Sequence, residues 1–248
     1  MQAEKKIPQT DALFAKMKAV NQSADATPTV LRVSWDAKAT VKLGEFSRGG
    51  KNRLERKAAD HDFHPDGLLN PFGILLPCHD DLTLYLTTSP VTSDFIVDTL
   101  IRWWDKKRPQ FPRVDTLVLN QDNGPEIQSR RTQFLKRMVA FARDHRLLIR
   151  LAYYPPYHSK YNAIEHVWGV LERHWNGEIL EEIPTALGFA RTMTWNGKHP
   201  EVELVTQAYP KGVRLTAAEM AVVEQHVQRD PKLGKWFLDI DGRARKLG

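Results

Sequence analysis

Three acidic residues, each placed at the end of an apolar segment, constrain this chain more than any other feature. Asp36 ends the run TVLRVSW, and Asp122 closely follows a second run, VDTLVLN. Both runs are rich in β-branched residues, which favours strands. Glu165 lies in the first turn of a helix predicted to follow the strand and Pro-Pro turn of LAYYPPYHSKYNAIEHVW. We therefore expect a fold in which two strand ends and one helix start meet.

The composition is that of one core with extensions. The chain has 248 residues, a formal net charge of +6 and a pI near 9.4, and the basic excess is spread along its length. Such a charge permits a polyanionic partner. The single cysteine, Cys78, excludes an intrachain disulfide and is expected to be a buried apolar residue in a reducing compartment. With no run of about 20 apolar residues and no signal sequence, we expect a soluble, cytoplasmic protein without a membrane partner.

The order of predicted elements defines a fold class. Strands are predicted over 29–35, 71–77 and 82–88, and three such strands in a row suggest an antiparallel meander. A separate return strand over 41–46 is expected to pair with the first. A helix over 93–104, a strand over 114–120, a helix over about 128–145 and a strand over 147–155 follow. The last strand–helix–strand unit should be a right-handed crossover between parallel strands. This order is that of a ribonuclease H-like α/β fold, a mixed five-stranded sheet flanked by helices.

In that fold the first strand lies beside the fourth, so Asp36 and Asp122 should be neighbours. The helix after Lys160 carries a core-facing stripe at i, i+3, i+4, i+7 and i+11, formed by Ile164, Val167, Trp168, Leu171 and Trp175. Glu165 borders this stripe and should lean over the strand ends.

Three regions are expected. Residues 1–29 form an N-terminal connector with a short helix over 11–20, residues 30–195 form the ribonuclease H-like domain, and residues 196–248 form a helical C-terminal extension packed on it. Helices are predicted over 184–193 and 216–228, and KWFLDI at 235–240 is a short strand or docked segment.

Three carboxylates close together repel one another, and hard divalent cations relieve that repulsion. Two Mg²⁺ or Mn²⁺ ions could activate a water or a 3′-hydroxyl for attack on a phosphodiester. Asp36 is the expected shared ligand, with Asp122 on one ion and Glu165 on the other. Singly, each acid is also an ordinary turn or helix-start residue. Competing acids are Glu126, Asp80, Asp81 and Glu172.

Basic residues near these acids are candidate DNA contacts. Arg48, Lys51 and Arg53 belong to a cation-rich stretch that is either a solvated surface or a phosphate-contacting arm. Lys160 could meet a phosphate, and Asn162 could orient Glu165 or contact a phosphate, although turn chemistry explains both equally well. The acidic and histidine cluster over 60–66 is a weaker metal candidate, since it has no regular spacing.

Several separated motifs resemble one family. SWDAKATVKLGEFSRGGK, FGILLP, LNQDNGPE, YYPPYHSKYNAIEHVWG and MTWNGKHPEVELV are similar to DDE transposases of bacterial insertion sequences, in the ISAzo-thirteen-like branch. The resemblance implies a ribonuclease H-like catalytic domain with Asp36, Asp122 and Glu165 as its acids. It also implies metal-dependent cutting of transposon-end DNA, strand transfer into target DNA, homo-oligomers assembled on DNA and a bacterial, DNA-associated location.

The chain departs from that family at its start. An N-terminal helix-turn-helix region would be expected to recognise the element's ends, and the residues before Thr29 are too few for one. The chain is therefore expected to be the catalytic part without that region. Two alternatives stay open: a ribonuclease H-like nuclease without strand transfer, and a truncated, non-catalytic DNA-binding remnant.

Overall fold

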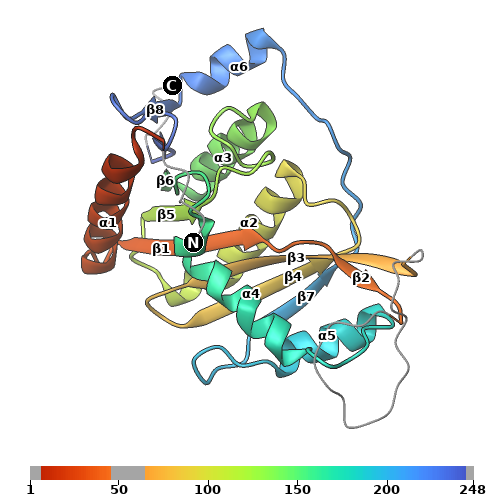
Figure 1. Ribbon diagram of the computed structural model, residues 1–248. Helices are drawn as coiled ribbons and strands as arrows, with labels where there is room; N and C mark the ends of the chain where they lie inside the picture. Colours follow the sequence, from red (N-terminus) through yellow and green to blue (C-terminus); the bar gives the residue numbers. More distant parts are fainter. Residues whose placement is uncertain (1–6, 46–64, 244–248) are drawn as a thin grey trace.

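A mixed β-sheet organises the molecule (Figure 1). The computed structural model describes residues 7–45 and 65–243. Within these residues nine strands form one sheet with the order β7-β4-β3-β1-β5-β6-β9-β8, and β2 pairs with β3 outside this path. The strands are β1 Val30–Ala37, β2 Val41–Leu43, β3 Gly67–Leu76, β4 Asp81–Thr87, β5 Thr116–Gln121, β6 Leu148–Tyr153, β7 Glu201–Val205, β8 Val227–Arg229 and β9 Phe237–Asp241.

The five central strands, β4-β3-β1-β5-β6, have the predicted ribonuclease H-like order. β1 pairs antiparallel with β3 and parallel with β5, and β5 pairs parallel with β6. The short turn between β3 and β4 allows an antiparallel pair, whereas β5 and β6 are joined by a helical crossover, which makes them parallel. The predicted fold class is confirmed.

Helices cover both faces of the sheet. Within the described residues they are α1 Thr10–Ala26, α2 Ser93–Lys107, α3 Thr132–His145, α4 Ala163–His174, α5 Ile183–Thr192 and α6 Ala217–Glu224, with the short 3₁₀ helices η1 Arg108–Gln110 and η2 Ser159–Tyr161. None of them is both long and apolar enough to cross a bilayer.

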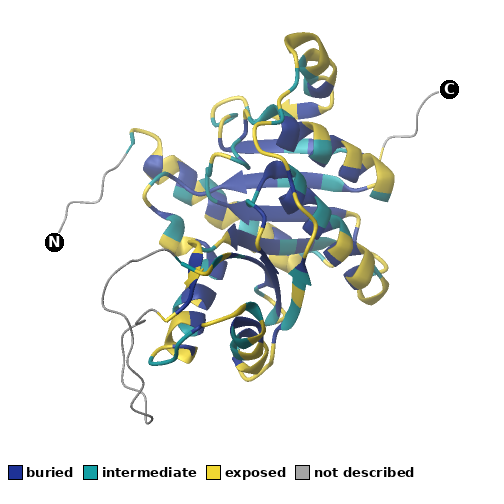
Figure 2. Ribbon diagram, turned by 90° about the vertical axis from the view of Figure 1, so that its right-hand side faces the viewer, coloured by how far each residue is buried: buried dark blue, intermediate teal, exposed yellow. Residues whose placement is uncertain are grey.

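The two faces of β1 show which helices lie on which side. Arg32 and Ser34 point to one face, where Arg32 hydrogen-bonds to Asp25 of α1 and Ser34 to Asn162 at the start of α4. Trp35 points to the other face and packs at 6.3 Å, between ring centroids, from Phe134 of α3. Buried residues follow the strands and the inward sides of the helices (Figure 2).

One strand-pairing prediction and one burial prediction need correction. Residues 41–43 pair with β3 and not with β1, because both edges of β1 are already occupied by β3 and β5. The predicted strand end at 46 lies outside the described residues. Cys78, expected to be buried, is exposed, because it lies in the turn between β3 and β4.

The C-terminal region is more strand-rich than predicted. β9 forms from the KWFLDI segment and pairs antiparallel with β6, while β7 extends the other edge by pairing parallel with β4. β7 was not predicted because EVELV is short and carries two glutamates. Helix α6 ends at Glu224, before the predicted 228, and β8 follows it. Helix α1 is longer than predicted and buries Leu13 and Met17.

Helix α4 packs closely against Gly73 of β3. Its predicted stripe is buried, and Gly73 of β3 lies beneath Ile164 and Trp168. A Cβ at Gly73 would lie 2.8 Å from Ile164 Cδ1 and 2.7 Å from Trp168 Cη2. Gly73 is also the cross-strand partner of Asp36. The missing side chain therefore lets α4 approach the sheet directly beside Asp36.

We expect Gly73→Ala to destabilise the protein by about 1–3 kcal/mol, because the added methyl group overpacks a closed contact. Urea unfolding measures this change. Gly188→Ala, within α5, is the control: a Cβ there meets nothing within 4 Å, and alanine is favoured over glycine in a helix by about 0.5–1 kcal/mol. An equal free energy of unfolding for the two variants would contradict the close packing of α4 against Gly73.

Candidate active site

The three predicted acids lie together at one edge of the sheet. Asp36 is near the end of β1, Asp122 directly follows β5, and Glu165 is in the first turn of α4. Because β1 and β5 are parallel neighbours, their carboxyl ends share an edge. Asp122 and Glu165 both lie close enough to Asp36 for their charges to act on its carboxyl group. The predicted juxtaposition of distant acids is present.

Burial and mutual repulsion perturb this cluster. Asp36 is only 9% exposed. Burial, then the charge of Asp122, then that of Glu165 raise the pKa of Asp36 to about 8. Burial also raises the pKa of Asp122, although the Gly124 N–H opposes the shift. A buried carboxylate beside two others is costly to ionise, so Asp36 holds a proton at neutral pH when no cation is present.

Asp122 is held by the turn that follows it. The Gly124 N–H donates to Asp122 Oδ1 at 3.0 Å. A Cβ at Gly124 would lie 3.1 Å from the same oxygen. Glycine at this position therefore allows the backbone to approach the carboxylate closely and fix its direction.

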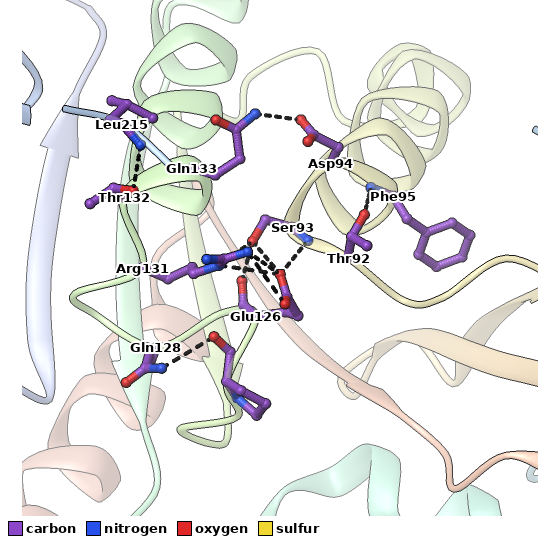
Figure 3. A network of polar contacts seen from close by, with 11 residues as sticks. Thr92, Ser93, Asp94, Phe95, Glu126, Gln128, Arg131, Thr132, Gln133 and Leu215 are labelled. Carbon is purple, nitrogen blue, oxygen red and sulfur yellow. Dashed lines mark hydrogen bonds and ion pairs between the residues drawn. The ribbon is translucent and has the colours of Figure 1, made fainter. Parts of the chain in front are cut away.

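The loop beyond this turn is anchored by Glu126 (Figure 3). Ser93, the first residue of α2, donates its backbone N–H to Glu126 Oε2 at 3.0 Å, and its hydroxyl to the Glu126 carbonyl at 2.7 Å. Arg131 pairs with the same carboxylate at 3.0 Å. Glu126 thus stabilises the start of α2 with a negative charge, and its carboxylate is engaged away from the acid cluster.

A buried set of hydrogen bonds fixes the start of α4 against β1. The Ser34 hydroxyl donates to Asn162 Oδ1 at 2.6 Å and accepts from the Ile164 N–H at 2.9 Å. Asn162 Nδ2 donates to the Trp35 carbonyl at 3.1 Å. Ser34 and Asn162 are 0% and 1% exposed. We call these three bonds the α4 latch; they hold Glu165, one residue beyond Ile164, over the end of β1.

The other competing acids are engaged in pairs elsewhere. Glu172 pairs with Lys38 and accepts from Trp175 Nε1 at 2.7 Å. Asp81 pairs with the buried Lys107 at 2.7 Å. Asp80, in a turn with positive φ, accepts from Asn196 at 2.7 Å. The contacts of Glu172 with Lys38, of Asp81 with Lys107 and of Asp80 with Asn196 join segments that are distant in the sequence.

The predicted DNA contacts fall into three groups. Arg48, Lys51, Arg53 and the cluster over 60–64 lie outside the described residues. Lys160 is exposed in η2, just before α4. Asn162 faces β1, with both ends of its amide bonded, so the structure favours its orienting role over a phosphate contact. Ser34 was not predicted; the available signal was a serine two residues before Asp36, on the same strand face.

The donor chemistry of the cluster suits a hard divalent cation. Asp36, Asp122 and Glu165 supply carboxylate oxygens, the ligands that Mg²⁺ and Mn²⁺ prefer. Beside them, Asn123 Oδ1 is a buried oxygen without a hydrogen-bond partner in the described part of the chain. Nowhere in residues 7–45 and 65–243 do three His, Cys, Asp or Glu side chains converge closely enough to enclose an ion as they stand. Side-chain closure would be needed on binding.

Comparisons with known proteins identify one matching family and several similar solved structures. A family model described as the Rhodopirellula transposase DDE domain matches residues 1–242. No curated protein matches the chain. The solved structures similar to it include the Mos1 transposase paired-end complex with left transposon end, at 9% identity and a TM-score of 0.49, covering 75% of this chain and 56% of that one. The Mos1 strand transfer complex matches at 8% identity and 0.49, with 75% and 54% covered. The Mos1 mariner paired-end complex with Mn matches at 8% and 0.46, with 75% and 55% covered. This chain thus spans little more than half the length of these proteins.

The raised pKa of Asp36 predicts how stability depends on pH. Between about pH 4 and pH 8 the folded protein keeps a proton that the unfolded chain releases, so metal-free stability should fall as pH rises through this range. Asp36→Asn should remove this dependence and raise Tm at pH 8 by several degrees, since 1 kcal/mol shifts Tm by about 2–4 °C in a domain of this size.

Thermal unfolding in EDTA from pH 4 to pH 8 measures the effect. Asp25→Asn is a control for which we expect the opposite change in Tm. Burial tends to raise the pKa of Asp25, but the hydrogen bond from Arg32 lowers it, and the pKa is lowered overall. The ionised carboxylate therefore stabilises the fold, and losing it should lower Tm at neutral pH. A wild-type Tm that rises with pH in parallel with that of Asp36→Asn would contradict the repulsion in the cluster.

The α4 latch predicts a local effect of Asn162→Ala. Removing this amide leaves buried partners unsatisfied, which should cost about 1–3 kcal/mol in the free energy of unfolding. Amide hydrogen exchange at Ile164 and Glu165 should accelerate more than exchange at Leu171, two turns along. Thr99→Val, which removes a buried hydroxyl bonded within α2, is the matched control and should leave exchange in α4 unchanged.

Proposed function

This chain belongs to the Rhodopirellula transposase DDE domain family, and from this premise we propose that it catalyses DNA cleavage and strand transfer with two divalent metal ions. The observation that carries the proposal is the burial of Asp36 between Asp122 and Glu165. The proposed substrates are transposon-end DNA and target DNA, handled by a homo-oligomer assembled on the DNA. The proposed location is the bacterial cytoplasm, where that DNA lies.

Each acid has a proposed role. Asp36 would be the ligand shared by the two ions, and Asp122 and Glu165 would each hold one of them. When bound, Mg²⁺ or Mn²⁺ would lower the pKa of the attacking hydroxyl and stabilise the departing oxygen. Asp36 would have to be deprotonated to serve as a ligand, and a nearby cation would oppose the repulsion that raised its pKa.

The surrounding residues position these ligands. The Gly124 N–H keeps one oxygen of Asp122 fixed, so its other oxygen is available to a metal. The α4 latch holds the helix start, so the backbone of Glu165 is fixed next to the end of β1. Fixing ligand directions in advance reduces the reorganisation needed during the reaction.

The proposed reaction has two balanced steps. A water oxygen attacks the phosphorus at the transposon end and loses a proton to solvent. The bond from phosphorus to the 3′-oxygen breaks, and the departing 3′-oxygen takes up a proton, which gives a 3′-hydroxyl and a 5′-phosphate. That 3′-hydroxyl then attacks a target phosphodiester. One phosphodiester forms, another breaks, and the departing 3′-oxygen takes up a proton.

We expect Asp36→Asn, Asp122→Asn and Glu165→Gln each to lower cleavage by at least about 100-fold, because the lost ligand supplies several kcal/mol and each 1.36 kcal/mol changes a rate tenfold. Nicking of supercoiled plasmid and joining of a 3′-hydroxyl oligonucleotide, with Mg²⁺ or Mn²⁺, measure the two steps. Glu172→Gln, on the same helix as Glu165, is the matched control and should retain activity.

The outcomes separate the alternatives. Nicking without joined products, with oligonucleotides of varied end sequence, would indicate a nuclease. DNA binding without metal-dependent nicking at any protein concentration would indicate a non-catalytic remnant. Full activity of any one of the three acid variants would remove that residue from the proposed metal site.

A further inference from the structure

A second surface feature lies at the same edge of the sheet as the acids. It is a pocket of about 340 Å³. The pocket is formed where the start of α1, the loop after β6 and the segment before β9 meet, and its lining includes Ile7, Pro8, Pro156, Lys232, Lys235 and Trp236. None of these residues has a role in the proposed chemistry.

The strand order places this pocket relative to the acids. The strand ends at this edge follow the order β1, β5, β6 and β9. Tyr153, which ends β6, pairs with Gln121 of β5 and donates its N–H to the Trp236 carbonyl at 2.9 Å. Trp236 is thus three strand spacings from Asp36, about 14 Å at about 4.8 Å each. That distance corresponds to about four base-pair steps of 3.4 Å.

The rim of the pocket carries positive charge. Lys232 and Lys235 are both exposed. Neither side chain forms an ion pair with a carboxylate of the described residues, whereas the neighbouring Arg229 pairs with Glu224 at 2.6 Å and Asp230 pairs with Lys16. Lys235 Nζ lies 4.9 Å from the centroid of the Trp236 ring. The two lysines are therefore placed for an anionic partner.

Aromatic side chains continue the surface toward α4. Tyr157, next to Pro156, is 70% exposed and has a φ of 67°, an uncommon conformation for a bulky residue. Tyr161 is 50% exposed, and its ring is braced by Phe14 at 5.0 Å and His158 at 6.1 Å between centroids. Lys160 Nζ lies 5.3 Å from the Tyr161 ring.

We propose that this basic aromatic surface, defined by Pro156, Tyr157, Lys160, Tyr161, Lys232, Lys235 and Trp236, binds an unpaired DNA strand that leaves the acidic site. One base occupies the pocket, and the phosphates on either side contact the lysines. The inference rests on the proposed function, because it takes DNA as the substrate. Cations interleaved with exposed aromatic rings, here those of Tyr157 and Tyr161, are the combination that binds single strands, through backbone charge and base stacking. Trp236 is only 4% exposed and contributes as a residue that lines the pocket. An acidic peptide would use the lysines but would leave the rings without a stacking partner.

The test uses the full chain in EDTA, so that binding is measured without cleavage. Fluorescence anisotropy compares a duplex that has a four-nucleotide overhang with the blunt duplex. Lys232→Ala/Lys235→Ala should weaken binding of the overhang form by about tenfold at low salt. It should also lower the slope of log affinity against log salt by about 1.4, at about 0.7 per phosphate contact on a single strand. Tyr157→Asn, whose asparagine tolerates positive φ, should reduce quenching of 2-aminopurine placed in the overhang.

The control carries the same change of charge elsewhere. Arg113→Ala/Lys136→Ala removes two exposed cations, one before the start of β5 and one on α3, and should leave the preference for the overhang unchanged. Equal weakening of overhang and blunt DNA by Lys232→Ala/Lys235→Ala would overturn the proposal, as would behaviour identical to the control. Plasmid nicking by the wild type is measured in parallel. If the wild type does not nick plasmid DNA but its preference for the overhang depends on the two lysines, the proposed function is wrong and the proposed DNA-binding surface is supported. If the wild type nicks plasmid DNA but its preference for the overhang does not depend on the lysines, only the proposed surface is wrong.

Discussion

The contact between the start of α4 and β1 is the constraint on which the acid cluster depends. Asp36 and Asp122 are placed by the sheet itself, because hydrogen bonds between parallel strands fix their relative position. Glu165 has no such framework. Its position depends on helix α4, which must lie at one distance from the sheet and in one rotation about its own axis. Gly73 sets the distance by leaving room for Ile164 and Trp168, and the α4 latch sets the rotation through Ser34 and Asn162. A helix held only by apolar packing would slide more easily, since such contacts have little directionality.

This arrangement keeps an unfavourable cluster inside a stable fold. Burial and two neighbouring acids raise the pKa of Asp36, so the metal-free site opposes folding at neutral pH and above. Two nearby acids are, by contrast, matched with donors or cations: Glu126 with Ser93 and Arg131, and Glu172 with Lys38. The repulsion at Asp36 has no such compensation, and strongly perturbed carboxyl groups of this kind are typical of functional sites.

Much of the fold, and the proximity of Asp36 to Asp122 and Glu165, could be predicted from the sequence, because both depend on periodic patterns. Alternation identified the central strands, and the stripe from Ile164 to Trp175 identified α4 and its buried face. The partner of β2 could not be predicted, since it depends on which strand edges remain free after β1 has paired on both sides. The latch was missed for a similar reason. Ser34 looks like any polar residue in an amphipathic strand, and only the position of α4 gives its hydroxyl two buried partners. β7 and β8 were missed because short, charged strands on the sheet's outer edges lack an apolar pattern.

The segments outside the five central strands explain why the edge that carries the acids is also the one with a groove. β9 adds a strand beyond β6, and its leading residues Lys235 and Trp236 therefore emerge at the same edge as Asp122. Helix α1 crosses the face that also carries α4, and Phe14 fills the space beside His158 and Tyr161. A five-stranded sheet alone would end at β6 and leave the end of that strand open to solvent. The added elements enclose this end and form the pocket, so the proposed binding of a strand and its proposed cleavage can share one edge of the sheet without sharing residues.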